Sequence, residues 1–177
     1  MIHPIEQSPF ALAMTWLLRP DVEGGYVNDP ADKGGKTKYG ISQRMYPDLD
    51  IENLSIQKAH DIYRLDYWSA CRVGEIPAPL SIALFDSVVH HRPRTAVTFL
   101  QQALSVSGDG LIGPQTITAA RIAVKRDGGK AALADMLARR AEFFAGLVTA
   151  DSSQARFHYG WLRRIFKLQQ YISEQQP

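Results

Sequence analysis

The chain of 177 residues is long enough for one domain or two small ones, and a hydrophobic content of 45% is ample for a packed core. Its single cysteine, Cys71, excludes an internal disulfide, and a small, unreactive packing role is favoured for it. No apolar run approaches the ~18 residues of a membrane span. The run nearest the start, Phe10 to Leu18, also lacks a basic leader, so we expect neither an anchor nor a signal peptide.

The net charge of +2 is unevenly distributed along the chain. Residues 1–90 carry 8 Lys and Arg against 12 Asp and Glu, a balance of −4, and residues 91–177 carry 12 against 6, a balance of +6. A basic half indicates an anionic partner such as nucleic acid, lipid headgroups or a phosphate-bearing cell wall. The alternative is a solvated helical surface rich in arginine. No basic motif interleaved with aromatic residues supports nucleic acid as the partner.

Helix signals dominate the chain in order. Ser8 and Pro9 can cap and begin a helix through Leu18, which Pro20 ends. Ser55 can cap a second helix, in which apolar residues recur every three or four positions. Later helical patterns cover Leu80–Val88, Val97–Leu104, Ile117–Val124, Ala131–Val148 and Arg156–Ile172, and "SGDGLIGPQT" forms a turn between two of them.

The only convincing strand signal lies directly after the first helix, in "VEGGYVNDPADKGGKTKYGIS", Val22 to Ser42. Residues 26–28 can form one strand, "DPADKGG" supplies turn residues, and residues 37–41 can return antiparallel. This hairpin brings Thr37 back toward Glu23. Gly24 and Gly25 leave little side-chain bulk beside that carboxyl, and we expect them to permit unusual backbone angles.

Two carboxyl groups in different surroundings suit glycoside hydrolysis. Glu23, at a helix end and partly walled by apolar groups, can hold a proton near neutral pH and act as a general acid. A second carboxylate in the polar loop, Asp29 or Asp32, stays ionised and can steer water or offset positive charge. The residues alone also fit a purely structural hairpin, because these turn formers are common.

The string "EGGYVNDPADKGGKTKYGIS" resembles the signature of glycoside hydrolase family 108, the lysozyme-like muramidases found among phage endolysins and bacterial cell-wall enzymes. The resemblance implies that Glu23 is the catalytic acid. Further family-like strings are "AHDIYRLDYW", residues 59–68, and "LFDSVV", residues 84–89. Together these strings cover roughly the first half of the chain.

The second half resembles the peptidoglycan-binding domain that commonly follows this catalytic unit. The resemblance depends on "LQQALSVSGDGLIGPQT", residues 100–116, and on "GWLRRI", residues 160–165. Two interpretations remain open at this point. These helices can bind the wall, or they can mainly buttress the catalytic half.

The second acid is placed by likeness to phage lysozymes, in which eight residues separate Glu from Asp and Thr follows about five further on. Here Glu23, Asp32 and Thr37 give intervals of eight and four. Asp32 is favoured, and Asp29 remains a competitor because Pro30 biases its backbone toward an extended geometry. Tyr26, Asn28 and Tyr39 are candidate sugar contacts, since aromatic faces and amides often grip saccharides, although either tyrosine can instead pack the hairpin.

One departure from the family pattern is "HHRPR", residues 90–94, where relatives tend to show Asn and Gly. Arg92 cannot adopt the tight backbone turn that a glycine would permit, so we expect the junction between the halves to have a different structure. The two histidines have no carboxylate or cysteine at ligand spacing, so we expect a solvated basic junction and no metal site.

We therefore expect a mainly α, lysozyme-like helical fold with one small β-hairpin at the active-site cleft. Residues 1–92 form the catalytic part and residues 93–177 a helical peptidoglycan-binding-like part, packed together as one monomer. The resemblance implies a peptidoglycan hydrolase that cleaves the β-1,4 bond between N-acetylmuramic acid and N-acetylglucosamine, without cofactor. The expected partners are glycan strands, with anionic envelope polymers as further partners of the basic half, and neither nucleic acid nor an integral membrane segment is expected.

The alternatives are a non-catalytic peptidoglycan-binding module and a lytic transglycosylase. Without a signal peptide, the chain is expected in the cytoplasm of its producing host, from which a holin or another delivery route would take it to the periplasm or wall. A toxin delivered by a secretion machine is equally compatible with the sequence.

Overall fold

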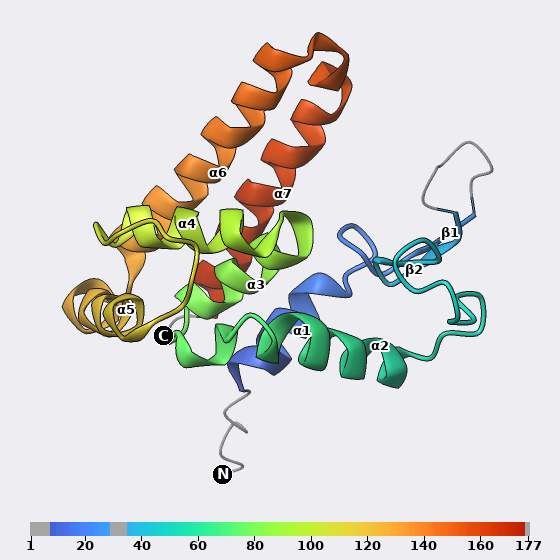
Figure 1. The fold of residues 1–177 in the computed structure, drawn as a ribbon, viewed down its shortest axis with the longest axis horizontal. Helices are drawn as coiled ribbons and strands as arrows, with labels where there is room; N and C mark the ends of the chain where they lie inside the picture. Colours follow the sequence, from blue (N-terminus) through green and yellow to red (C-terminus); the bar gives the residue numbers. More distant parts are fainter. Residues whose placement is uncertain (1–7, 29–34, 176–177) are drawn as a thin grey trace.

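The computed structural model describes residues 8–28 and 35–175, and this part of the chain is mainly helical with a small sheet at one end (Figure 1). The expected helices are all present. They are α1 (Pro9–Leu17), α2 (Ile56–Ile62), α3 (Leu80–His90), α4 (Pro93–Ala103), α5 (Pro114–Asp127), α6 (Lys130–Ala150) and α7 (Ala155–Glu174). A π-helical turn, η1 (Tyr63–Ser69), continues α2, and short 3₁₀ turns are η2 (Val73–Glu75) and η3 (Ser152–Gln154).

The capping residues read from the sequence act as expected. The Ser8 hydroxyl accepts a hydrogen bond from the backbone N–H of Ala11 at 3.2 Å, and Pro9 occupies the first helical position of α1. The Ser55 hydroxyl accepts from the N–H of Lys58 at 3.1 Å. Each cap satisfies an otherwise unpaired N–H group and so fixes where its helix begins.

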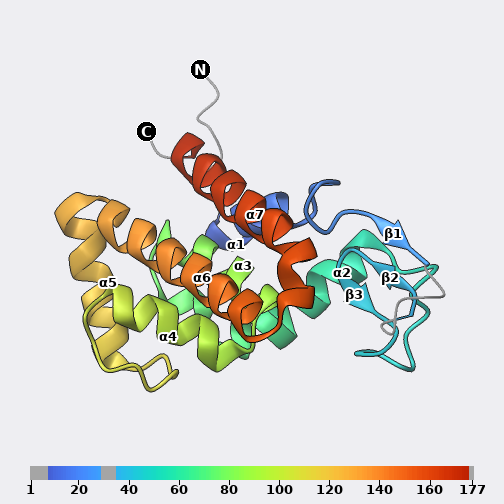
Figure 2. The same cartoon turned by 90° about the horizontal axis from the view of Figure 1, so that it is seen from above.

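Helix α3 is the centre of the core. Every residue from Leu80 to Val88 is buried, and the helix packs against α1, α4, α6 and α7. A helix that is apolar nearly all round must be covered on all sides, which explains this central position. Seen from above, α7 crosses over α1 and α3 (Figure 2), and Tyr171 of α7 donates a 2.8 Å hydrogen bond to the carbonyl of Leu12.

The sheet has three short antiparallel strands in the order β1 (Tyr26–Val27), β2 (Thr37–Lys38) and β3 (Ile41–Ser42). The expected single return strand over residues 37–41 is wrong. Tyr39 and Gly40 both have positive φ, 53° and 76°, so the chain turns there and begins a third strand. The sheet therefore gains a tight turn between β2 and β3, and that turn faces Glu23.

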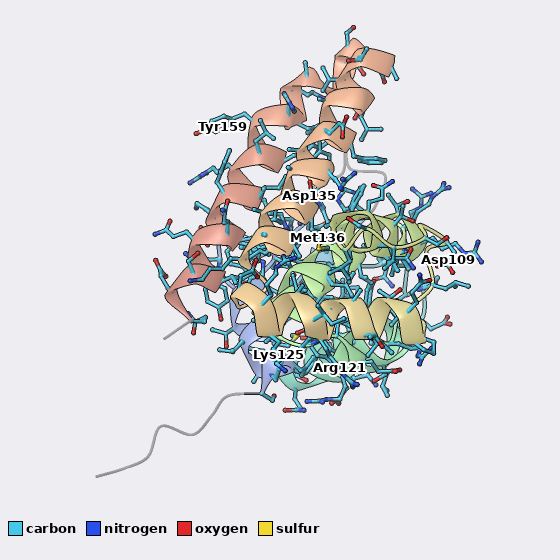
Figure 3. All side chains as sticks on the ribbon, turned by 90° about the vertical axis from the view of Figure 1, so that its left-hand side faces the viewer. Asp109, Arg121, Lys125, Asp135, Met136 and Tyr159 are labelled. Atoms are coloured by element: carbon cyan, nitrogen blue, oxygen red, sulfur yellow. The ribbon has the colours of Figure 1, made fainter. Side chains whose placement is uncertain are left out.

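Helices α6 and α7 form an antiparallel pair that projects from the helical body on the side away from α2 (Figure 1). Seen from the side of α5, Arg121 and Lys125 extend outward from that helix and Tyr159 extends away from α7, while Met136 lies inside (Figure 3). Among the helices of the described residues, none has the length and apolar character needed to cross a membrane.

Candidate active site

Glu23 lies in the turn that closes the end of α1. Its backbone N–H donates to the carbonyl of Leu17 at 3.0 Å, and the N–H of Gly24 donates to the carbonyl of Arg19 at 2.9 Å. These bonds satisfy carbonyls that the helix end leaves unpaired, so the backbone at residue 23 is fixed relative to α1.

The two glycines after Glu23 have different roles. A Cβ at Gly24 would lie 2.1 Å from the carbonyl oxygen of Leu18, whereas a Cβ at Gly25 would meet nothing within 4 Å. Neither glycine has a positive φ. The expectation of unusual backbone angles is therefore wrong, and Gly24 is needed because the chain passes close against the end of α1.

The carboxyl of Glu23 is held by an arginine from the last helix. Arg164 Nη1 donates to Glu23 Oε1 at 2.5 Å, and the two side chains are 12% and 24% exposed. The prediction that apolar groups partly surround the Glu23 carboxyl is thus wrong on this side, where the Arg164 guanidinium lies instead. The other oxygen, Oε2, accepts no hydrogen bond from the described residues.

Glu23 Oε2 lies against the turn between β2 and β3. A Cβ at Gly40 would lie 3.0 Å from Oε2 and 2.5 Å from the hydroxyl of Tyr63. That hydroxyl donates to the carbonyl of Tyr39 at 2.8 Å. Burial, with the charge of Glu23, raises the pKa of Tyr63, so its hydroxyl stays protonated and holds the turn beside the carboxyl.

Arg164 bridges Glu23 to a fully buried carboxylate, Asp86 of α3. Asp86 Oδ1 accepts from Arg164 Nη2 at 2.8 Å, from Arg164 Nε at 3.0 Å and from Trp16 Nε1 at 2.7 Å, and Oδ2 accepts from Arg140 Nη1 at 2.5 Å. Burial alone would raise the pKa of Asp86, but the guanidiniums of Arg164 and Arg140 outweigh it and hold the pKa well below its usual range. Asp86 is therefore a permanent anion that orients both arginines.

The sheet brings some of the expected sugar contacts close to Glu23. Tyr39 is half-buried, and its backbone N–H donates to the carbonyl of Gly25 at 3.0 Å, which ties β2 to the Glu23 turn. Tyr26, 44% exposed on β1, and Asn28, just after that strand, are both exposed.

The remaining expected site residues are less closely placed. Thr37 pairs with Val27 and Ser42 in the sheet, and no hydrogen bond joins it to Glu23 in the described part of the chain. Asp29 and Asp32 lie outside the described residues. The choice between these two carboxylates therefore stays a prediction.

A hollow of about 230 Å³ lies between the end of α1 and α7, and we call it the α7 hollow. Its lining includes Val22, next to Glu23 in the chain, and Arg164, which holds Glu23. The lining also includes the aromatic residues Trp16 and Trp161 and the ion pair of Asp21 with Lys167. The α7 hollow is therefore an amphipathic surface that Arg164 links to the carboxyl of Glu23.

The histidines of the "HHRPR" junction are turned inward. Arg140 Nε donates to His91 Nε2 at 3.0 Å, and Arg140 Nη2 lies 3.1 Å from His90 Nδ1. Burial, followed by the charge of nearby arginines, lowers the pKa of both rings to about 3. The expectation of a solvated basic junction is wrong for these two residues, although Arg92 and Arg94 are exposed.

No metal ligands gather in the part of the chain that the structure describes, since no three His, Cys, Asp or Glu residues there could hold an ion together. Cys71 is half-buried, and burial raises the pKa of its thiol, as expected for a packing residue. The described groups that contact one another around Glu23 are carboxyl, guanidinium and hydroxyl groups.

The residues that sequence reasoning missed are Arg164, Asp86 and Arg140. Their signal is a charge within an apolar pattern, because Asp86 is the only Asp, Glu, Lys or Arg in "LSIALFDSVVH". A carboxylate on a helix that is buried all round must find a cationic partner. The sequence could indicate that a partner exists, but not which of twelve basic residues in the second half supplies it.

Comparisons with known proteins agree with this architecture. Residues 18–91 match the family described as Glycosyl hydrolase 108, and residues 95–166 match the family described as Predicted Peptidoglycan domain. The chain is also similar to a solved structure, that of Brucella abortus SagA, at 29% sequence identity and a TM-score of 0.75, over 93% of this chain and 94% of that one. No curated protein matches the chain.

Proposed function

Because the chain joins a glycosyl hydrolase family 108 domain to a predicted peptidoglycan domain, we propose that it hydrolyses the β-1,4 bond between N-acetylmuramic acid and N-acetylglucosamine in peptidoglycan. The observation that carries this proposal is the carboxyl of Glu23. One of its oxygens is fixed by Arg164, and the other is left without a hydrogen bond from the described residues. A carboxyl oriented in this way suits proton transfer to a bound sugar.

Glu23 acts as the general acid through Oε2, which gives its proton to the leaving glycosidic oxygen. A positioned acid contributes about 10²–10⁴ in rate. Arg164 is the positioning residue, because its bond to Oε1 fixes the rotation of the carboxyl group. Arg164 is itself held by an ion pair with buried Asp86.

The second carboxylate is Asp32, with Asp29 as the competing choice. In this mechanism Asp32 and Thr37 position the attacking water or offset the oxocarbenium-like charge. A separation of ~6.5–9.5 Å between the two carboxyl groups would give inversion and ~5–5.5 Å would give retention. NMR of the first anomer released from a soluble glycan distinguishes the two outcomes.

Sugar binding involves the sheet beside Glu23. Tyr26 and Asn28 are exposed on β1 and just after it, and Tyr39 lies at the turn that meets the carboxyl. An aromatic face packs on the apolar side of a sugar ring, and an amide can pair with its acetamido group. These three residues are our candidates for contacts with the sugars that flank the cleaved bond.

The deciding experiment is a digest of purified peptidoglycan with the wild type and with Glu23→Gln, followed by mass spectrometry of the products. The matched control is Glu75→Gln, since Glu75 is also bound to an arginine but is exposed and remote from this site. We expect reducing muramic acid ends from the wild type and from the Glu75 variant, and a loss of at least about 10² in rate for Glu23→Gln.

Two outcomes would contradict this proposal in different ways. Anhydro-muramic acid ends would identify a lytic transglycosylase, which needs no water-positioning carboxylate. The absence of cleavage products from the wild type would identify a non-catalytic wall-binding module, and full cleavage by Glu23→Gln would show that Glu23 is not the acid.

A further inference from the structure

A second hollow, of about 500 Å³, lies where the end of α3 and the start of α4 meet the α6–α7 pair. We call it the histidine–aromatic hollow, and the residues that matter in it are His90, His91, Thr95, Phe143, Phe144 and Trp161. The proposed cleavage at Glu23 makes no use of it. Its volume falls in the range of small-ligand sites.

The two histidines give this hollow uncharged hydrogen-bond donors. Arginine only donates, so the ring nitrogens that face Arg140, Nδ1 of His90 and Nε2 of His91, must be acceptors. The remaining nitrogen of each ring then carries the proton. With the pKa of both rings lowered to about 3, they remain neutral donors at physiological pH.

The aromatic residues give the hollow firm apolar walls. Trp161 stacks on Phe144 with centroids 4.6 Å apart and planes 18° apart, and Phe143 meets His91 edge to face at 5.3 Å. Phe143 remains 37% exposed, so part of its ring is free to contact a ligand. These rings support one another and would lose little freedom when a ligand binds.

This combination fits an N-acetylated sugar. A pyranose ring has apolar C–H faces that pack on aromatic rings, and its hydroxyl and acetamido oxygens accept hydrogen bonds from neutral N–H groups. Arg92 also lines the hollow and is exposed, so a carboxylate of the stem peptide could pair with it. The aromatic walls favour the sugar over the peptide, and the peptide-free strands used in the test separate the two ligands.

The histidine–aromatic hollow shares two lining residues with the α7 hollow. His90 and Trp161 line both it and the α7 hollow, and the α7 hollow also contains Val22 and Arg164 beside Glu23. A chain of sugars bound at Glu23 could therefore extend along α7 into it. We propose that the histidine–aromatic hollow binds an N-acetylated sugar unit of the glycan strand, at a distance from the cleaved bond. This inference rests on the proposed function.

The test measures binding of peptide-free glycan strands, prepared by amidase treatment of peptidoglycan, to the Glu23→Gln variant by calorimetry. Phe143→Ala removes an aromatic wall, and Thr95→Trp fills the hollow from the first turn of α4. We expect each to weaken binding at least about tenfold. The control, Phe166→Ala, removes a 66% exposed ring of α7 outside the hollow and should leave the affinity unchanged.

Thr95→Trp removes no core contact, so it keeps the test decisive if Phe143→Ala fails to fold. Unchanged affinity in folded Thr95→Trp would overturn the inference. Binding of only those strands that retain their stem peptides would also overturn it, in favour of a peptide site.

In chains that retain Glu23, Thr95→Trp should slow cleavage of long strands but not of a four-sugar fragment. This pattern separates the inference from the proposed function, which instead fails if Glu23→Gln stays active.

Discussion

Arg164 follows Glu23 by 141 residues in sequence, yet its Nη1 donates a 2.5 Å hydrogen bond to the carboxylate. The arginine belongs to α7, within the region matched to the predicted peptidoglycan domain, and the glutamate belongs to the region matched to the glycosyl hydrolase. The second half of the chain therefore contributes a side chain to the candidate active site. This finding supports the buttressing interpretation of these helices without excluding a binding role.

The first prediction concerns Arg164 itself. Arg164→Lys replaces a planar fork with a point charge, which cannot bridge Glu23 and Asp86 at once. We expect kcat on peptidoglycan to fall about 10–10²-fold with little change in KM, because the acid is misplaced and the sugar contacts remain. Arg164→Met, which has no charge, should lower kcat further.

The matched control for this change is Arg156→Lys, an exposed position in the first turn of α7. It should retain full activity. Equal kcat in wild type and Arg164→Met would show that the ion pair has no part in catalysis.

The second prediction concerns Asp86. Asp86→Asn removes the anion that shares the charge of Arg164 and Arg140. We expect a loss of about 3–5 kcal/mol in the free energy of unfolding, since buried guanidiniums are left unpaired. Arg164 would also lose the anion that holds its guanidinium in place beside Glu23, so kcat of the folded protein on peptidoglycan should fall. A wild-type kcat in folded Asp86→Asn would contradict this orienting role.

The third prediction compares the two glycines after Glu23. Gly24→Ala forces a Cβ to within 2.1 Å of the carbonyl of Leu18, so the turn must move and take Glu23 with it. We expect lower thermal stability and a loss of activity. Gly25→Ala meets no atom within 4 Å and should be nearly neutral in stability by calorimetry. The pair is its own control, because the same change is made one residue apart.

The fourth prediction is a pH dependence of stability that arises from His90 and His91. Their folded pKa is lowered to about 3, below the ~6.5 of the unfolded chain. The unfolded state thus binds more protons, and stability is lost as the pH falls from ~6.5 toward ~3, by up to about 1.4 kcal/mol per pH unit for each ring.

Urea titrations at pH 7 and pH 5 measure this effect. The double variant His90→Asn, His91→Asn should show a smaller difference between the two pH values than the wild type. Equal differences would place the dependence elsewhere in the chain.

The helices could be predicted because their signals are local. Ser8, Ser55 and the apolar periodicities each act within a few residues, and the structure follows them. The sheet was predicted less well, because the positive φ of Tyr39 depends on tertiary contacts and not on local sequence. The hydroxyl of Tyr63, from another element, holds that carbonyl.

The candidate site was predicted only in part for the same reason. Glu23 could be found from its string and from the helix end that precedes it. Its partner could not, because the ion pair with Arg164 depends on how α7 crosses α1 and α3. The boundary expected between residues 92 and 93 and the role of Asp32 stay predictions.

The arginine contributed by α7 limits how such enzymes can be recombined. A chimera that exchanged the second half for an unrelated wall-targeting module would retain Glu23 but lose the guanidinium that orients it. Engineered antibacterial fusions should therefore append new modules to the intact chain. Within an exchanged half, the residue equivalent to Arg164 must be kept at the same turn of its helix.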